Sequence, residues 1–171
     1  MIKIFYLLML VVLATPIPAG AESRSFSILG TEGNIIGSAG LVSGPHGTVI
    51  TISVSKNGLR HGWHGIHIHQ VGNCSDTGSF KLSKGHINPS AKKHGFLNPD
   101  GPHPADLPNI YAAKDGSVNA ELLAPGVSLG ESGENLLDTD GSAIVIHDNP
   151  DDHNSQPIGG AGIRVACAII K

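Results

Sequence analysis

The chain has 171 residues, of which 15% are charged, and its formal net charge of −3 at pH 7 argues against the basic surfaces that bind nucleic acids or anionic membranes. This length suits one domain with a substantial hydrophobic core. The 23 glycines predict many turns, and the 2 cysteines allow at most one disulfide bond within the chain.

The N-terminal segment has the pattern of a secretory signal peptide. Lys3 precedes an apolar run from Ile4 to Ala14, and small residues follow at 19–21. The run is too short to cross a bilayer. We therefore expect cleavage after Ala21 and export from the cytoplasm, which leaves residues 22–171 as a single domain. A buried N-terminal helix is the alternative.

Residues 25–55 alternate between apolar and polar side chains, with the period of two that is typical of half-buried strands. Strands are predicted around Phe26 and Ile28, from Ile35 to Val42, and from Ile50 to Ser55, where the alternation is clearest. The Asn57-Gly58 pair that follows predicts a hairpin turn.

The next predicted strand, from Trp63 to His69, carries a concentrated histidine pattern. His67 and His69 alternate with Ile66 and Ile68. In a strand the isoleucines point into the core and the two histidines share the other face, with Cα atoms about 6.5–7 Å apart, so both rings can reach one metal ion. A strand edge with solvated histidines is the alternative for this pair taken alone.

Regular alternation stops between residues 72 and 109. A loop of this length inside a compact domain needs something to hold it, and metal ligands and a disulfide bond are the fasteners that the sequence offers. In an exported protein, the pair Cys74 and Cys167 predicts a disulfide bond. Two free buried thiols are the alternative.

Strands resume in the second half of the chain. They are predicted from Ile110 to Ala113, from Val118 to Leu123, from Ala143 to His147 and from Ile163 to Ile170. No segment has the pattern of a helix of convincing length. Many short strands separated by turns predict an all-β sandwich or barrel.

Seven side chains on the histidine-bearing strand, the long loop and the strand ending at residue 147 are candidate metal ligands. They are His67, His69, His86, His94, His103, Asp106 and His147. Imidazole suits copper and zinc, and a carboxylate among imidazoles also suits zinc. Two neighbouring ions that share one imidazole would need eight ligand contacts, which these seven residues supply.

Five motifs, taken in order, resemble those of the copper/zinc superoxide dismutase family. They are His64-Gly65-Ile66-His67-Ile68-His69, with Ile66 where the family usually has Phe; Gly85-His86-Ile87-Asn88-Pro89; Lys93-His94-Gly95 with His103-Pro104-Ala105-Asp106-Leu107; Ile146-His147; and the run from Gly159 to Cys167. The resemblance implies an eight-stranded Greek-key barrel, or immunoglobulin-like sandwich, with long metal-binding and electrostatic loops.

The resemblance also implies one copper and one zinc ion per chain and a ligand set for each. Copper would be held by His67, His69, His86 and His147, and zinc by His86, His94, His103 and Asp106, so that His86 bridges the two ions. Asp151 matches the aspartate that joins a copper ligand to a zinc ligand, here His67 and His94. Its alternative role is that of a solvated loop acid.

Arg164 matches the arginine that guides the substrate in this family, and its alternative role is a surface charge on the last strand. If Val165 and Ile169 face the core, Arg164 faces the loops that carry the ligands. The long loop carries four further cations, Lys81, Lys84, Lys92 and Lys93. They form either a solvated basic face or a field that steers an anionic substrate.

The implied activity is that of an exported, periplasmic-type superoxide dismutase, which converts superoxide to oxygen and hydrogen peroxide. Copper would cycle between two oxidation states, zinc would hold the loop, and His86 would take up a proton. A metal carrier on the same fold and an adhesive β-sandwich are the rival functions. No nucleic-acid or membrane partner is expected for the mature chain, and a monomer and a homodimer are both left open.

Overall fold

The computed structural model describes residues 22–130 and 133–171, and the predicted signal peptide lies outside them. The strands are β1 (Glu22–Gly30), β2 (Ile35–Gly44), β3 (Gly47–Val54), β4 (Gly62–His64), β5 (Ile66–His69), β6 (Ile110–Ala112), β7 (Val118–Ala124), β8 (Val127–Ser128), β9 (Glu134–Asn135), β10 (Ser142–His147) and β11 (Arg164–Ile170). Among these residues one 3-10 turn, η1 (Lys81–Ser83), is the only helical element, and none forms a helix long and apolar enough to traverse a bilayer.

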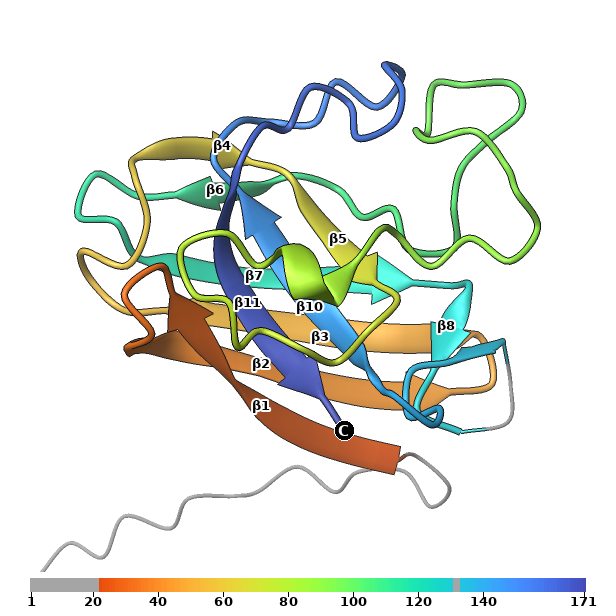
Figure 1. The fold of residues 1–171 in the computed structure, drawn as a ribbon, viewed down its shortest axis with the longest axis horizontal. Coiled ribbons are helices and arrows are strands. Elements are labelled where there is room, and N and C mark those ends of the chain that lie inside the picture. The colour runs from red at the N-terminus through yellow and green to blue at the C-terminus, as the bar shows by residue number, and fades with distance from the viewer. Residues whose placement is uncertain (1–21, 131–132) are drawn as a thin grey trace, which may run out of the picture.

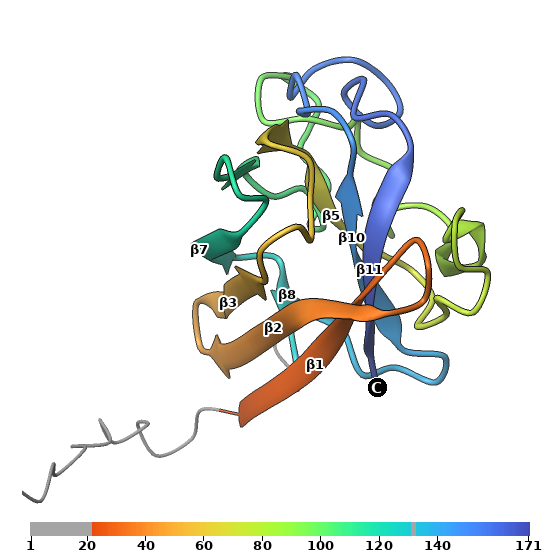
Figure 2. The same ribbon diagram turned by 90° about the vertical axis from the view of Figure 1, so that its left-hand side faces the viewer.

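Seven strands form one curled antiparallel sheet, in the order β5-β10-β11-β1-β2-β3-β7 (Figures 1 and 2). β4 pairs with β6, and these two strands run on to β5 and β7, which are the two edges of the curled sheet. The pair therefore bridges the opening of a half-barrel. Because β5 lies beside β10 and β11 beside β1, the chain crosses between non-consecutive strands, and the predicted Greek-key architecture is confirmed.

The alternating sequence of β3 shows how the core is made. Thr48, Ile50, Ile52 and Val54 are buried, while the residues between them face solvent. The same period two places isoleucines, leucines and alanines from all the long strands in one cluster inside the curl. The side chains between the core residues point to the other face of the sheet, where the strands hold them at a fixed spacing.

The histidine-bearing strand, predicted as one piece, is interrupted at Gly65. The amide of Gly65 donates to Asn149 O at 2.8 Å, and the amide of His147 donates to Gly65 O at 2.8 Å. A Cβ atom at Gly65 would lie 3.0 Å from the Cβ of Ala161, so the loop 148–162 packs closely against the chain at this point. The interruption lets β4 pair with β6 while β5 pairs with β10.

Val165 packs against the main cluster as expected, but the expectation that Ile169 faces the core with it is wrong. Ala166, Ala168 and Ile170 belong to the main cluster, whereas Ile169 packs on the outer face. A bulge explains the difference: β10 and β11 pair Ile146 with Ala166 but His147 with Arg164, so the alternation of β11 is reset at Val165.

The outer face of β10 and β11 is covered by the long loop, and the predicted disulfide bond is confirmed there. Cys74 and Cys167 are joined across 93 residues, with their Cα atoms 6.0 Å apart. Phe80 from the same loop is fully buried beside them, against Ala143 and Val145 of β10. The disulfide bond therefore ties the first part of the long loop to the sheet.

The later part of the long loop, up to residue 106, lies beside the loop 148–162 beyond one end of the half-barrel (Figure 1). Leu97 N donates to His153 O at 2.9 Å, and the amide of Gln156 brackets the backbone of His94. The two loops are thus fastened to each other above the strand ends that carry the histidines.

Candidate metal centre

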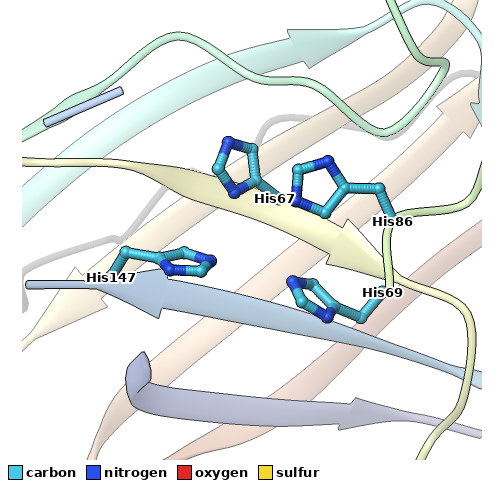
Figure 3. A group of neighbouring side chains, drawn as sticks. All are labelled: His67, His69, His86 and His147. Carbon is cyan, nitrogen blue, oxygen red and sulfur yellow. The ribbon is translucent and has the colours of Figure 1, made fainter. Parts of the chain in front are cut away.

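Four histidines converge from three parts of the fold (Figure 3). His67 and His69 lie on β5, His147 ends the neighbouring strand β10, and His86 comes from the long loop. His86 joins the sheet through an isolated bridge with His69. One ring nitrogen of each histidine lies within 4.8 Å of those of the other three, and all four side chains are buried.

These four rings each have one buried nitrogen without a hydrogen-bond partner. The atoms are Nδ1 of His67 and Nε2 of His69, His86 and His147. A buried polar atom left unpaired costs free energy, and four such atoms facing one another are the arrangement that a metal ion resolves. Four imidazole nitrogens are a donor set that fits copper.

The opposite nitrogen of the three strand histidines is fixed by the protein. His67 Nε2 lies 2.8 Å from Asp151 Oδ2, His69 Nδ1 lies 2.8 Å from Lys84 O, and His147 Nδ1 lies 3.2 Å from Gly162 O. These acceptors place the hydrogen on the far nitrogen and leave a lone pair on the near one. Burial lowers the pKa of His67 to about 4 and that of His147 to about 3, so both rings are neutral donors at physiological pH.

A second group gathers around one carboxylate oxygen, Asp106 Oδ1. It lies 2.9 Å from His94 Nδ1, 3.2 Å from His86 Nδ1 and 3.3 Å from His103 Nδ1. A tetrahedral zinc ion with ligands at 2.0–2.1 Å requires ligand separations of about 3.3 Å. Three imidazoles and one carboxylate at these spacings fit zinc.

The other oxygen of Asp106 fixes the loop. It accepts hydrogen bonds from the amides of Gly95 at 2.9 Å and His103 at 3.0 Å. Although burial opposes ionisation, the hydrogen bonds from His86, His94 and the backbone hold the pKa of Asp106 well below its usual range. Burial also opposes the charge on His94, but its two carboxylate partners raise its pKa to about 9.

His86 is the residue that the two groups share, since its Nε2 faces the first group and its Nδ1 the second. By mutual distance of their donor atoms, His67 also clusters with His86, His94 and Asp106. However, Nε2 of His67 is taken by Asp151. His103, through its contacts with His86 and Asp106, completes the second group.

Asp151 connects the two groups from behind. Its Oδ2 lies 2.8 Å from His67 Nε2, and its Oδ1 lies 3.0 Å from His94 Nε2. Asn109 holds Asp151 in turn, because its amide donates to Asp151 O and accepts from Asp151 N, each at 2.8 Å. The backbone of Gly159 lies so close to Asp151 that a Cβ atom at Gly159 would overlap the Asp151 carboxylate.

A hollow of about 660 Å³ opens over the first group. His69, His86 and His103 contribute to its floor, and its wall carries five cations, Lys81, Lys84, Lys92, Lys93 and Arg164. In the described part of the chain, none of the residues that line it is acidic. A small anion therefore meets positive potential throughout its approach.

Three polar residues that the sequence did not single out hold side chains or backbone of the site in position. Asn109 brackets Asp151, the Gln156 amide pairs with the backbone of His94 at 2.9 Å on both sides, and Ser83 contacts Arg164. His153 is only partly exposed, with its Nδ1 3.6 Å from Asp151 Oδ2. His64 is buried between Arg60 O and His147 O and contributes no ligand atom to either group.

The chain is similar to known proteins along most of its length. Residues 35–170 match the family model described as copper/zinc superoxide dismutase. A Cu-Zn superoxide dismutase of Caulobacter vibrioides is 48% identical over 143 residues, covering 82% of this chain and 80% of that protein. Cu-Zn superoxide dismutase 2 of Aquifex aeolicus is 43% identical over 145 residues, covering 84% of each chain.

Solved structures give the same result for the fold. A SOD-like protein from Bacillus subtilis superposes with a TM-score of 0.80 at 38% identity, covering 86% of this chain and 97% of the other. The Cu/Zn superoxide dismutase from Brucella abortus superposes with a TM-score of 0.69 at 25% identity, covering 88% and 100%. The motifs, the Greek-key sheet and the two donor groups agree with these matches, and the chain belongs to the copper/zinc superoxide dismutase family.

Proposed function

We propose that this protein is a superoxide dismutase in which His67, His69, His86 and His147 hold copper and His86, His94, His103 and Asp106 hold zinc. The single observation that carries the proposal is the set of four buried, unpartnered imidazole nitrogens beneath a hollow walled by cations. One superoxide loses an electron to give oxygen, and another gains an electron and two protons to give hydrogen peroxide. When bound, copper supplies the change of oxidation state, and zinc supplies a fixed positive charge.

His86 is placed to handle a proton. Its Nδ1 is directed toward Asp106 in the second group, while its Nε2 faces the first group, and the residue lines the hollow. Nε2 can hold a proton whenever it is not acting as a ligand. We therefore assign to it the uptake of a proton and its delivery to the reduced oxygen species.

Arg164 is placed to hold the anion. Its guanidinium lies in the wall of the hollow, partly exposed and fastened to backbone oxygens of the long loop. A guanidinium keeps its charge at every physiological pH, so it attracts and orients a small monoanion beside the copper donors. The four lysines around the hollow extend the attraction over a longer range.

The proposal extends to the cellular location and the domain. Residues 1–21 form a cleaved signal peptide, and residues 22–171 form one exported domain, periplasmic in a bacterium. The disulfide bond between Cys74 and Cys167 supports an oxidising compartment, because such bonds are rare in the cytosol. The substrate is superoxide, and the mature protein acts as a monomer or a homodimer without a nucleic-acid or membrane partner.

Two measurements on the purified protein test the function. Metal analysis is expected to give about one copper and one zinc per chain, and superoxide consumption is expected to depend on the copper. A metal carrier on the same fold would bind both ions without turnover. An adhesive β-sandwich would hold no stoichiometric metal.

Arg164→Ile tests the anion role. The variant is expected to keep both metals, to lose superoxide turnover severalfold, and to bind azide more weakly, because the fixed positive charge at the hollow is gone. The wild-type rate is expected to fall as ionic strength rises. An unchanged rate together with unchanged azide sensitivity in the variant contradicts the role of Arg164.

A further inference from the structure

The guanidinium of Arg164 is held by three acceptors that all come from one short segment, residues 80–84. Nη1 donates to Phe80 O at 2.6 Å and to Ser83 Oγ at 3.1 Å, and Nη2 donates to Lys84 O at 2.7 Å. The last strand and the long loop are therefore joined at the side chain that faces the substrate hollow. The position of Arg164 depends on how this segment is built.

Ser83 contributes the only side-chain acceptor of the three. Its hydroxyl is fully buried and donates to Phe80 O at 2.7 Å. This leaves its oxygen lone pairs to face Arg164 Nη1 at 3.1 Å and His69 Nδ1 at 3.3 Å. One oxygen atom thus lies between the guanidinium and a proposed copper ligand.

Asp76 holds the turn in which Ser83 lies. Its carboxylate accepts from Ser79 Oγ and Lys81 N, each at 2.7 Å, and from Leu82 N at 3.3 Å. Phe80 has a φ of 50° and Lys84 a φ of 64°, both in the left-handed region that is costly for residues with a Cβ atom. The segment keeps this conformation because Phe80 is anchored in the disulfide cluster and Asp76 satisfies its amides.

We propose that Ser83 is a positioning residue whose hydroxyl, together with the neighbouring carbonyl of Lys84, fixes Arg164 and His69 relative to each other, with the Asp76 carboxylate holding the turn that contains both acceptors. The inference rests on the proposed function and deepens it. An anion that contacts both the guanidinium and the copper site needs these two groups at a constant separation. Phe80 O contacts Arg164 alone, whereas Lys84 O and Ser83 Oγ each contact both Arg164 and His69. Of these two acceptors, only the Ser83 hydroxyl belongs to a side chain and can be removed by substitution.

The test is azide binding to the copper- and zinc-loaded protein, followed by the optical change of copper, because this readout does not require turnover. Ser83→Ala is expected to keep both metals and to raise the dissociation constant for azide about two- to tenfold, the effect of one lost hydrogen bond. In superoxide turnover KM is expected to rise more than kcat falls. Ser83→Thr, which keeps the hydroxyl, is expected to restore most of the azide affinity.

The matched control is Ser75→Ala, because the Ser75 hydroxyl is in the same loop but bonds only locally, to Asn73. It is expected to bind azide as the wild type does. Asp76→Ala changes a surface side chain and is expected to weaken azide binding in the same direction as Ser83→Ala. This variant keeps the proposal testable if the buried site does not tolerate alanine or threonine.

Wild-type azide affinity in both Ser83→Ala and Asp76→Ala overturns the proposal. Loss of copper from Ser83→Ala with unchanged azide affinity in the remaining copper sites also overturns it, because the hydroxyl would then serve His69 alone. Failure of the proposed function is a separate result. It would appear as wild-type protein that binds copper and azide but does not consume superoxide.

Discussion

The two donor groups share His86 but are built in opposite ways. Three of the four proposed copper donors, His67, His69 and His147, lie on adjacent strands whose register fixes their spacing. The four proposed zinc donors all come from one loop, between residues 86 and 106, which is tied to the edge strand β5 by isolated bridges at His86 and Asp106. The strand-borne nitrogens face one another without partners, whereas the loop-borne donors are bonded to one another through Asp106.

This difference indicates what keeps the donor atoms of each group in position. The sheet holds the proposed copper donors on the strands at a fixed spacing, so these donors need little rearrangement when a metal binds. The loop is joined to the sheet only near His86 and Asp106, and hydrogen bonds to Asp106 hold the part between them. Asp151 connects the two groups, because its carboxylate bonds to His67 of the first and His94 of the second.

Removing the shared residue is the strongest way to break the comparison. His86→Ala deletes one ligand from each group and is expected to abolish superoxide turnover and to lower the content of both metals. Metal analysis of the variant after dialysis against a weak chelator measures this. His46→Ala is a control on an exposed turn. Full occupancy by copper and zinc in His86→Ala would show that His86 does not bridge the sites.

The disulfide bond gives the next largest effect, on stability. The double variant Cys74→Ser, Cys167→Ser removes a link across 93 residues. For loops of this length the chain-entropy model gives a loss of roughly 4–5 kcal/mol in the free energy of unfolding. Denaturant unfolding of the metal-free variant and of the oxidised wild type measures this loss. Reduced wild type is the control, because it lacks the bond but keeps both cysteines. Equal unfolding midpoints for the variant and the oxidised wild type would contradict this expectation.

Proton competition sharpens the contrast between the two groups. In the metal-free protein the pKa of His94 is about 9, so the ring is charged at pH 7 and zinc must displace its proton. Zinc affinity is therefore expected to rise about ninefold from pH 7 to pH 8 and about fiftyfold from pH 7 to pH 9, where the dependence begins to level off. His67 and His147, with pKa values of about 4 and 3, hold no proton to displace in this range.

Chelator competition at several pH values measures the zinc affinity, and histidine NMR signals of the metal-free protein report each ring directly. His94 is expected to titrate near pH 9 and His67 near pH 4. A zinc affinity that is independent of pH between 7 and 9, once corrected for the chelator, would refute the charged state of His94.

Asp151→Ala is expected to have a smaller effect than His86→Ala, and it acts on both groups at once. Loss of the carboxylate frees Nε2 of His67 and of His94, and such changes cost about 10–100-fold in metal affinity or activity. Asp152→Ala is the matched control, because that neighbour is exposed and bonds only to backbone amides of its own loop. Equal copper and zinc affinities in the two variants would return Asp151 to the role of a solvated acid.

The strand pattern was predictable from the sequence because period two is a local property. Ile66 and Ile68 are buried in the core, and His67 and His69 share the opposite face, as the alternation indicates. The interruption at Gly65 was not predictable, because it arises from the packing of Ala161, which is distant in the sequence. The bulge at Val165 likewise depends on the pairing of two strands and moved the core face of β11 by one residue.

The ligand candidates were predictable by residue type, whereas the residues that hold them were not. Asn109, Gln156 and Ser83 carry no signal in the sequence, since amides and hydroxyls are common in loops and each acts here on a residue from another part of the chain or across a turn. Loop residues that belong to no alternating pattern are positioned by tertiary contacts, which the sequence alone does not reveal.

The cationic hollow has a second consequence, for the loading of the protein with copper. The field that draws in a superoxide anion repels a free divalent cation, and the same five side chains line the approach to the copper donors. Copper is therefore expected to enter more readily as a neutral or anionic complex than as the bare aqueous ion. Added salt should slow the capture of superoxide and hasten the uptake of aqueous copper, so one surface imposes opposite ionic-strength dependences on maturation and on turnover.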